Sequence, residues 1–306
     1  MAKVRLIAVD SGCDNHKVRG EAGELDFKTR ITYDKHKDES LLGGNTFNVV
    51  HNDNKYVIGN QADLEVPETG KDTLPHFIGT LTSIALMKGD ADEIILMYGE
   101  SFNRYLDEKH KEKVRNLFVG KHEIEVNGKV YKFKITLCHI LPEGLGHILM
   151  ELSSYAGVNI AVDWGGSTVN YLKVVDGIPT NESKSFELGS HKLVAAVRDE
   201  LDIANLGNQD IDMIKNWIRN GTKNRQVQEI IDNCKRDILR KLDRELGRYG
   251  INLNKMYDGV TFIGGTSEML REQIREHYSY SEIHKDCLMA NVNGFYKFGT
   301  LKYGVK

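Results

Sequence analysis

The sequence predicts an α/β protein built from two related halves. The first observation is a repeat: Ile7–Gly12 reads IAVDSG and Ile160–Gly165 reads IAVDWG, so five of six positions are identical. The copies lie half the chain length apart, which indicates an internal duplication. The second observation is that each copy is an apolar, β-branched strand that ends in Asp-x-Gly and then resumes an extended pattern. The third is that segments of helical periodicity occur in both halves.

The first half is expected to open with a strand over 3–9 and a turn from Asp10 to Asn15. Lys17 follows two residues into the return strand. It either points its ammonium at the turn or is an ordinary exposed strand lysine. From about residue 30 to 72, short extended segments alternate with turn residues, which predicts a small β-rich insertion of two or three strands.

The rest of the first half alternates between helix and strand patterns. The expected elements are a helix over 73–88, a strand over 93–98, a charged helix over 101–118 capped by Ser101, a hairpin around Asn127-Gly128 and a helix over 145–155. The corner Pro142-Glu143-Gly144 precedes the last helix. A turn glutamate is usually structural, and Glu143 gains interest because the second Asp-Gly hairpin begins soon afterwards.

The second half repeats the hairpin and continues with helices. The strand over 158–162 leads into the turn Gly165–Thr168, and the chain returns over 169–175. Gly189 precedes a predicted helix, and further helices are expected over 211–218 and 227–246. A strand over 259–263 ends in Gly264-Gly265, where Thr266 or Ser267 is expected to cap a helix.

These turns suggest phosphate chemistry. Glycines without a Cβ let backbone N–H groups approach an anion, and a carboxylate at the strand end could hold a divalent cation on it. One such hairpin alone would favour a purely structural interpretation, but the second copy favours a phosphate and magnesium site. Gly264-Gly265 offers a third place where a phosphate or ribose could meet backbone N–H groups. Neither a P-loop motif nor a strand-anchored G-x-G-x-x-G is present.

Composition restricts the class of protein. A formal net charge of −3 over 306 residues gives no general basic field, so direct DNA binding is not expected. The four cysteines form no C-x-x-C pair, which argues against a zinc site or a disulfide framework and fits a reducing cytoplasm. No apolar run approaches 18 residues and the N-terminus has no signal-like segment, so we expect a cytoplasmic protein without membrane association.

The order of motifs resembles the superfamily of actin, sugar kinases and heat-shock chaperone ATPases. The resemblance implies two related α/β domains, with duplicated ribonuclease-H-like cores and a nucleotide cleft between them. Within the superfamily the chain is most similar to the ParM-like bacterial actins over nearly its whole length. The motifs that carry this similarity are Asp10-x-Gly-x-x-Asn15-x-Lys17, Leu141-Pro142-Glu143, Tyr56–Gly59 and Val292–Tyr296. It implies domain I over 1–157, domain II over 158–290, and a final segment, 291–306, that packs back on domain I.

The resemblance also implies roles for individual residues. Asp10 and Asp163 would hold Mg²⁺ mainly through its waters, and Glu143 would orient or deprotonate the attacking water; these three form the implied catalytic set. The implied nucleotide-binding residues are Ser11, Gly12, Cys13, Asn15, Lys17, Gly165, Gly166, Ser167, Thr168, Gly189, Gly264, Gly265 and Thr266. The last three would form the adenosine motif. Cys13 and Asp14 depart from the Ser and Thr that are usual in the first phosphate loop.

The implied function is a nucleotide-dependent filament whose hydrolysis of ATP, or of GTP, makes the polymer unstable. It would associate head-to-tail with itself and segregate plasmid DNA through a ParR-like adaptor bound at a centromere. A small-molecule kinase of the same superfamily is the alternative, weakened because the cysteine-cluster zinc motif of one large sugar-kinase group is absent. A non-hydrolysing structural homologue is disfavoured, because Asp10, Glu143 and Asp163 are all present.

Overall fold

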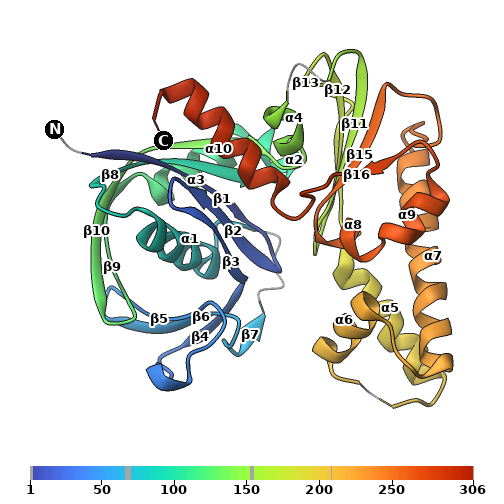
Figure 1. Cartoon of the computed structure of the whole chain (residues 1–306), viewed down its shortest axis with the longest axis horizontal. Coiled ribbons are helices and arrows are strands. Elements are labelled where there is room, and N and C mark those ends of the chain that lie inside the picture. Colours follow the sequence, from blue (N-terminus) through green and yellow to red (C-terminus); the bar gives the residue numbers. More distant parts are fainter. Residues whose placement is uncertain (1–2, 66–69, 152–154, 208, 306) are drawn as a thin grey trace. The chain divides into compact units, whose positions relative to one another are not determined.

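The computed structural model describes residues 3–65, 70–151, 155–207 and 209–305. The chain forms two compact units, each with its own sheet (Figure 1). Unit 1 comprises Met1–Leu152 together with Met289–Lys306, and unit 2 comprises Ser153–Leu288. Unit 1 is therefore assembled from two separate stretches of the chain.

The sheet of unit 1 has ten strands among the described residues, in the order β3-β2-β1-β8-β10-β9-β5-β6-β4-β7. The strands are β1 (Val4–Ser11), β2 (Asn15–Gly20), β3 (Gly23–Lys28), β4 (Arg30–Tyr33), β5 (Thr46–His51), β6 (Asn54–Gly59), β7 (Leu64–Glu65), β8 (Glu93–Glu100), β9 (Gly120–Val126) and β10 (Lys129–Pro142). Strands β1, β8 and β10 are mutually parallel neighbours, so their carboxyl ends meet at one edge of the sheet. The β-rich insertion adds its strands to this same sheet, because β5 pairs with β9.

Helices cover both faces of this sheet. The helices of unit 1 are α1 (Leu74–Met87), α2 (Phe102–Tyr105), α3 (Glu108–Phe118), α4 (Gly146–Met150) and α10 (Ala290–Tyr303), and the 3₁₀ turn η1 (Glu39–Leu41) buries no residue. Alternation along β1 explains the two faces. Ile7 and Val9 join the core that includes residues of α1, whereas Leu6 faces α10, where a Cβ on Gly299 would lie 2.5 Å from Leu6 Cδ1. Figure 1 shows the sheet curving around α1.

Unit 2 has a six-stranded sheet in the described residues, with the order β13-β12-β11-β15-β16 and β14 paired with β12. Its strands are β11 (Val158–Trp164), β12 (Val169–Val175), β13 (Ile178–Pro179), β14 (Lys184–Phe186), β15 (Gly259–Ile263) and β16 (Glu282–Ile283). Its helices are α5 (Ser190–Ile203), α6 (Ile211–Asn220), α7 (Arg225–Gly247), α8 (Gly265–Met269) and α9 (Arg271–His277). Apolar stripes on α5 and α7 bury Leu193, Val197, Ile231 and Ile238.

The predicted hairpins are confirmed. The two copies of the repeat form the β1–β2 and β11–β12 hairpins, both antiparallel. The hairpin at Asn127-Gly128 joins β9 to β10, and both turn residues have positive φ, at 48° and 73°. This is the conformation for which Asn-Gly is selected in two-residue hairpin turns.

Four predicted details were wrong. The single charged helix over 101–118 is broken, because Asp107 accepts from the N–H groups of Lys109 and His110 and starts α3 as a separate helix. The helix over 145–155 is confined to α4 in the described residues, and residues 152–154 of that prediction lie outside them. The β-rich insertion was expected to contain two or three strands, and four described strands, β4 to β7, lie within it. The fourth difference concerns the cap of α8, which is Gly264 rather than Thr266 or Ser267.

No helix in the described part of the chain combines the length and apolar character needed to cross a bilayer.

Candidate functional site

The turn of the first hairpin is held from one side by Thr29. The Gly12 N–H donates to the Asn15 carbonyl at 3.0 Å and closes the turn. Thr29 Oγ1 donates to the carbonyl of Gly12 at 2.6 Å, and the Thr29 N–H donates to the carbonyl of Asp14 at 2.9 Å. A carbonyl and the following N–H point in opposite directions across a trans peptide. The Cys13 N–H therefore faces away from Thr29, as an anion-binding turn requires.

Asp10 lies at the end of β1 between two lysines. Its Oδ1 is 3.3 Å from Lys71 Nζ and its Oδ2 is 3.6 Å from Lys17 Nζ. Burial opposes ionisation of this carboxyl, but Lys71 and then Lys17 outweigh that effect and lower the pKa of Asp10 to about 2. The carboxylate is therefore charged at neutral pH. Lys17 is its register partner in β2, and 17% of the Lys17 side chain is exposed.

Glu143 lies immediately after β10, at the same edge of the sheet. Its N–H donates to the carbonyl of Glu100 at 2.7 Å, and its carboxylate forms an ion pair with Lys71. The following residue, Gly144, has φ +89° and donates its N–H to Asn291 Oδ1 at 3.0 Å. Asn291 also hydrogen-bonds Asp10. Lys71 therefore connects Asp10 to Glu143, and Asn291 connects Asp10 to the adjacent Gly144.

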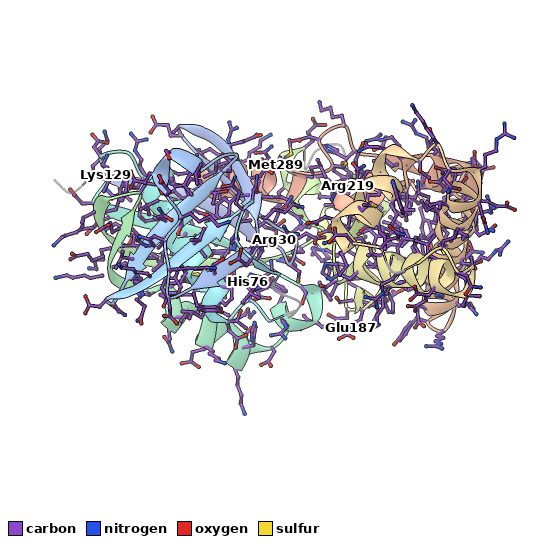
Figure 2. All side chains as sticks on the ribbon, turned by 90° about the horizontal axis from the view of Figure 1, so that it is seen from below. Arg30, His76, Lys129, Glu187, Arg219 and Met289 are labelled. Carbon is purple, nitrogen blue, oxygen red and sulfur yellow. The ribbon has the colours of Figure 1, made fainter. Side chains whose placement is uncertain are left out.

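A buried histidine pair lies under the first hairpin. Ser11 Oγ is 2.7 Å from His76 Nδ1 and 3.4 Å from His16 Nε2. His76 is labelled in Figure 2, and both histidines are at most 1% exposed. Burial, followed by repulsion from His76 and Lys71, holds the pKa of His16 well below its usual range. The Ser11 side chain is thus committed to this internal cluster, and the residue is fully buried.

The second hairpin turn is fixed by the start of α5. The N–H groups of Gly189, Ser190 and His191 donate to the carbonyls of Ser167, Gly165 and Gly166, respectively, at 2.9–3.2 Å. All three carbonyls therefore point toward α5.

The same peptide planarity then fixes the amide side of this turn. The structure contains no cis peptide bond among its described residues. The N–H groups of Gly166, Ser167 and Thr168 must therefore point away from α5. Three consecutive turn amides on one side form an anion-binding nest. Gly189 has to be glycine, because a Cβ there would lie 2.1 Å from the Gly166 carbonyl oxygen.

Asp163 and the Gly264 corner meet beside this turn. A Cβ on Gly264 would lie 2.6 Å from Asp163 Oδ1 and 2.5 Å from the Trp164 carbonyl oxygen, and Gly264 has φ +95°. Thr266 Oγ1 donates to the Gly165 carbonyl at 2.7 Å, so the Thr266 side chain supports the turn. Gly265 begins α8 and has open space where a Cβ would be. The predicted residues of the second half therefore do lie together.

Sequence reasoning missed Lys71, which links the predicted carboxylates of unit 1, and Asn291, which contacts Asp10 and accepts from the Gly144 N–H. Lys71 lies between β7 and α1, at the end of the predicted β-rich insertion, and Asn291 lies in α10; neither belongs to a sequence motif. Thr29 was also missed. These three residues are isolated in the sequence, and no motif or regular spacing connects them to the predicted site residues. The only available clue was that buried carboxylates need partners.

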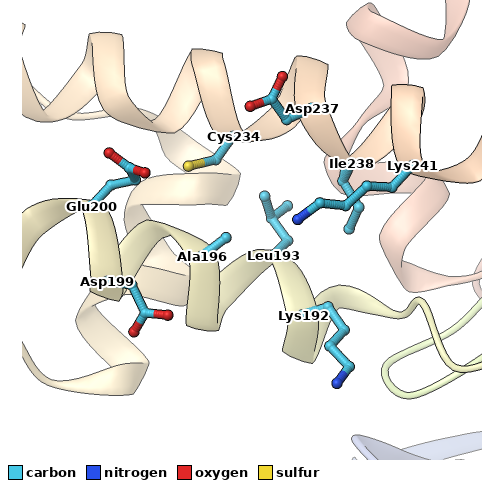
Figure 3. Close-up of a pocket in the computed structure, with 9 residues that line it drawn as sticks. All are labelled: Lys192, Leu193, Ala196, Asp199, Glu200, Cys234, Asp237, Ile238 and Lys241. Carbon is cyan, nitrogen blue, oxygen red and sulfur yellow. The ribbon is translucent and has the colours of Figure 1, made fainter.

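A separate groove lies between α5 and α7 and contains none of the predicted residues (Figure 3). Its volume is about 220 Å³, and Leu193, Cys234 and Ile238 form its buried part. Charged side chains surround these three residues: Lys192, Asp199, Glu200, Asp237 and Lys241. Burial raises the pKa of the Cys234 thiol to about 11, so this thiol is a packing group rather than a nucleophile.

Comparison with known proteins identifies the fold. Residues 8–146 match the family described as "Actin like proteins N terminal domain". A search of curated proteins gave no significant match. Solved structures match over nearly the whole length, and the chain has an actin-like α/β fold.

Three solved structures illustrate the similarity. The archaeal actin homologue Ta0583, in complex with ADP, is 17% identical with a TM-score of 0.77, covering 97% of this chain and 98% of that one. The Alp12 filament structure is 24% identical with a TM-score of 0.71, covering 98% and 99%. A 15-stranded ParM filament from Clostridium botulinum is 13% identical with a TM-score of 0.79, covering 98% and 100%.

Proposed function

We propose that this chain is a nucleoside triphosphatase that polymerises head-to-tail and segregates plasmid DNA through a DNA-bound adaptor. The observation that carries the proposal is the amide nest of Gly166–Thr168, directed by α5 and adjacent to Asp163. Unit 1 contributes a hairpin of the same sequence pattern, with Asp10, Lys17 and Glu143 at its sheet edge. The amide nest and the Lys17 ammonium suit the binding of phosphate groups. The carboxylates of Asp10 and Asp163 suit a metal ion, and that of Glu143 suits an attacking water.

Related solved structures support the nucleotide and the filament. Ta0583 was solved with ADP, and Alp12 and a ParM were solved as filaments. We transfer both properties to this chain as part of the proposal, with ATP as the first nucleotide to test and GTP as the second. The adaptor is proposed because the net charge of −3 gives this chain no basic surface field for DNA. We therefore expect no co-sedimentation with DNA unless the adaptor is added.

The described residues fit a hydrated Mg²⁺ better than a directly ligated one. They contain no cluster of three or more His, Cys, Asp or Glu side chains placed to hold a metal. Asp10 is ionised but already contacts two ammonium groups. Mg²⁺ keeps several waters in such sites and takes one or two carboxylates plus substrate phosphates. Asp10 and Asp163 would hold it through those waters, and when bound it would neutralise charge on the phosphate oxygens.

The remaining steps belong to the side chains and amides of this chain. The nest of Gly166–Thr168 and the Cys13 amide would bind phosphate oxygens, with Lys17 as a point charge. Glu143 would orient the attacking water, and its carboxylate forms an ion pair with Lys71. Phosphoryl transfer to water depends mainly on positioning and charge stabilisation, so these contacts suffice as the protein's contribution.

The test is right-angle light scattering with phosphate release recorded in the same sample, after ATP and Mg²⁺ are added. We expect scattering to rise and then to decay as phosphate appears. Protein without nucleotide is the control and should not scatter. If the protein binds ATP but scattering stays flat, and an added acceptor becomes phosphorylated with formation of ADP and without release of free phosphate, the kinase alternative is supported and the filament proposal fails.

A further inference from the structure

The ammonium of Lys71 joins the carboxyl ends of three neighbouring strands. It contacts Asp10 Oδ1 at the end of β1 at 3.3 Å and donates to the Gly99 carbonyl of β8 at 3.0 Å. Its third contact is the Glu143 carboxylate, directly after β10. These strands are adjacent and parallel, so Lys71 bridges the edge of the sheet that carries Asp10 and Glu143, the two catalytic candidates of unit 1.

The donor count decides what Lys71 can do. An ammonium has three N–H donors, and here three acceptors take them. The Lys71 side chain is 5% exposed, whereas that of Lys17 is 17% exposed and lies at the other Asp10 oxygen. Lys71 therefore has no donor left for a phosphate in this arrangement.

The geometry points to Lys71 as a positioning residue that fixes Glu143 relative to Asp10, while Lys17 supplies the phosphate contact. This inference rests on the proposed nucleoside triphosphatase function. It assigns the two lysines on either side of Asp10 to different steps. Lys71 acts on the hydrolytic step through Glu143, and Lys17 acts on nucleotide binding.

The experiment compares Lys71→Met with Lys17→Met in single-turnover hydrolysis and in nucleotide titration. Misplacing a reacting group by about 1 Å can cost on the order of a hundredfold in rate, so Lys71→Met should slow hydrolysis by about that factor. Its nucleotide affinity should stay within about twofold of wild type. Lys17→Met should have the opposite effect: nucleotide affinity should fall, and the hydrolysis rate of the bound nucleotide should be largely unchanged.

A double variant tests whether Lys71 acts through Glu143. Adding Lys71→Met to Glu143→Gln should change the rate little further, because residues that act as a unit are not additive. If the rate reductions of Lys71→Met and Glu143→Gln multiply in the double variant, the two residues act independently and the inference is overturned. It is also overturned if Lys71→Met hydrolyses at the wild-type rate. A purely structural role would instead lower affinity and rate together.

Two controls keep the outcomes separate. If Lys71→Met does not fold, Lys71→Arg keeps the charge but places it in a planar fork, and it should slow hydrolysis while nucleotide binding is retained. If Lys71→Arg hydrolyses the nucleotide as fast as the wild-type protein does, the assignment of Lys71 is contradicted. If wild type binds nucleotide and does not hydrolyse it, the proposed function fails. If wild type hydrolyses and both Lys71 variants match it, only the assignment of Lys71 fails.

Discussion

Lys17 Nζ lies 3.6 Å from Asp10 Oδ2, and the two residues are register partners across the first hairpin. The lysine neutralises part of the negative charge that a phosphate would meet there. Replacing it by methionine keeps most of the side-chain volume and removes the charge.

Lys17→Met should weaken ATP binding about tenfold or more, since hydrogen bonds to charged groups contribute about 1.5–3 kcal/mol. Isothermal titration would measure the change. Lys129→Met is the matched control, because Lys129 is an exposed lysine of the same sheet and is labelled in Figure 2. Equal affinities for the two variants would rule out a phosphate contact by Lys17.

Glu143→Gln should keep nucleotide affinity within about twofold and reduce phosphate release by a factor on the order of 10²–10⁴, the usual contribution of a positioned acid or base. The amide preserves the shape of the side chain but cannot accept from Lys71 as a charged partner. In the scattering assay this variant should reach a plateau and hold it. A plateau that decays as fast as in wild type would show that Glu143 takes no part in hydrolysis.

Gly189→Ala should displace the second hairpin turn. The added Cβ would lie 2.1 Å from the Gly166 carbonyl oxygen, in a place where only backbone atoms could move. We expect a loss of about 1–3 kcal/mol in the free energy of unfolding, together with weaker nucleotide binding.

Gly247→Ala is the control for this change. A Cβ at Gly247, the last residue of α7, meets nothing within 4 Å. This alanine should be neutral or stabilise unit 2 by up to about 1 kcal/mol through helix propensity and reduced unfolded-state entropy. Urea unfolding would compare the two variants, and equal midpoints would contradict the proposed packing of Gly189 on the turn.

Acid should destabilise the first hairpin through His16. Burial and the neighbouring His76 hold the pKa of His16 well below its usual range, so the folded state keeps the ring neutral. An unfolded histidine gains a proton below a pH of about 6.5, so the unfolded state binds more protons and stability falls as the pH drops below that value.

The measurement is the free energy of unfolding of wild type and His16→Gln between pH 8 and pH 5, with pH 8 as the reference. A difference of one bound proton between the folded and unfolded states changes the free energy of unfolding by about 1.4 kcal/mol per pH unit. The pH dependence of the free energy of unfolding should therefore be less steep in the variant by up to this amount. His51, His122 and His139 also have lowered pKa values, so a residual slope is expected. Identical slopes for the two proteins would exclude His16 as a source of acid sensitivity.

The sequence predicted the hairpins because their determinants are local. Glycine, Asn-Gly and β-branched runs specify a turn and its strands within a few residues, as at Asn127-Gly128. The break before α3 was missed because Ser101 and Asp107 are both good N-caps, and local preference alone does not rank them. Lys71 was missed for a different reason. Its contacts with Asp10 and Glu143 span 61 and 72 residues, and only the folded sheet edge brings them together.

The position of α10 has a consequence for the order of synthesis. This helix supplies Asn291 to the Asp10 and Glu143 edge, and it packs so closely on α4 that a Cβ on Gly294 would lie 1.8 Å from the Gly146 carbonyl oxygen. All of unit 2, Ser153–Leu288, is translated before that helix emerges. At roughly 5–20 residues per second, the delay is on the order of ten seconds. During that time the nascent chain exposes the Leu6 and Met97 face of its first sheet, and the second unit is free to fold before the first is complete.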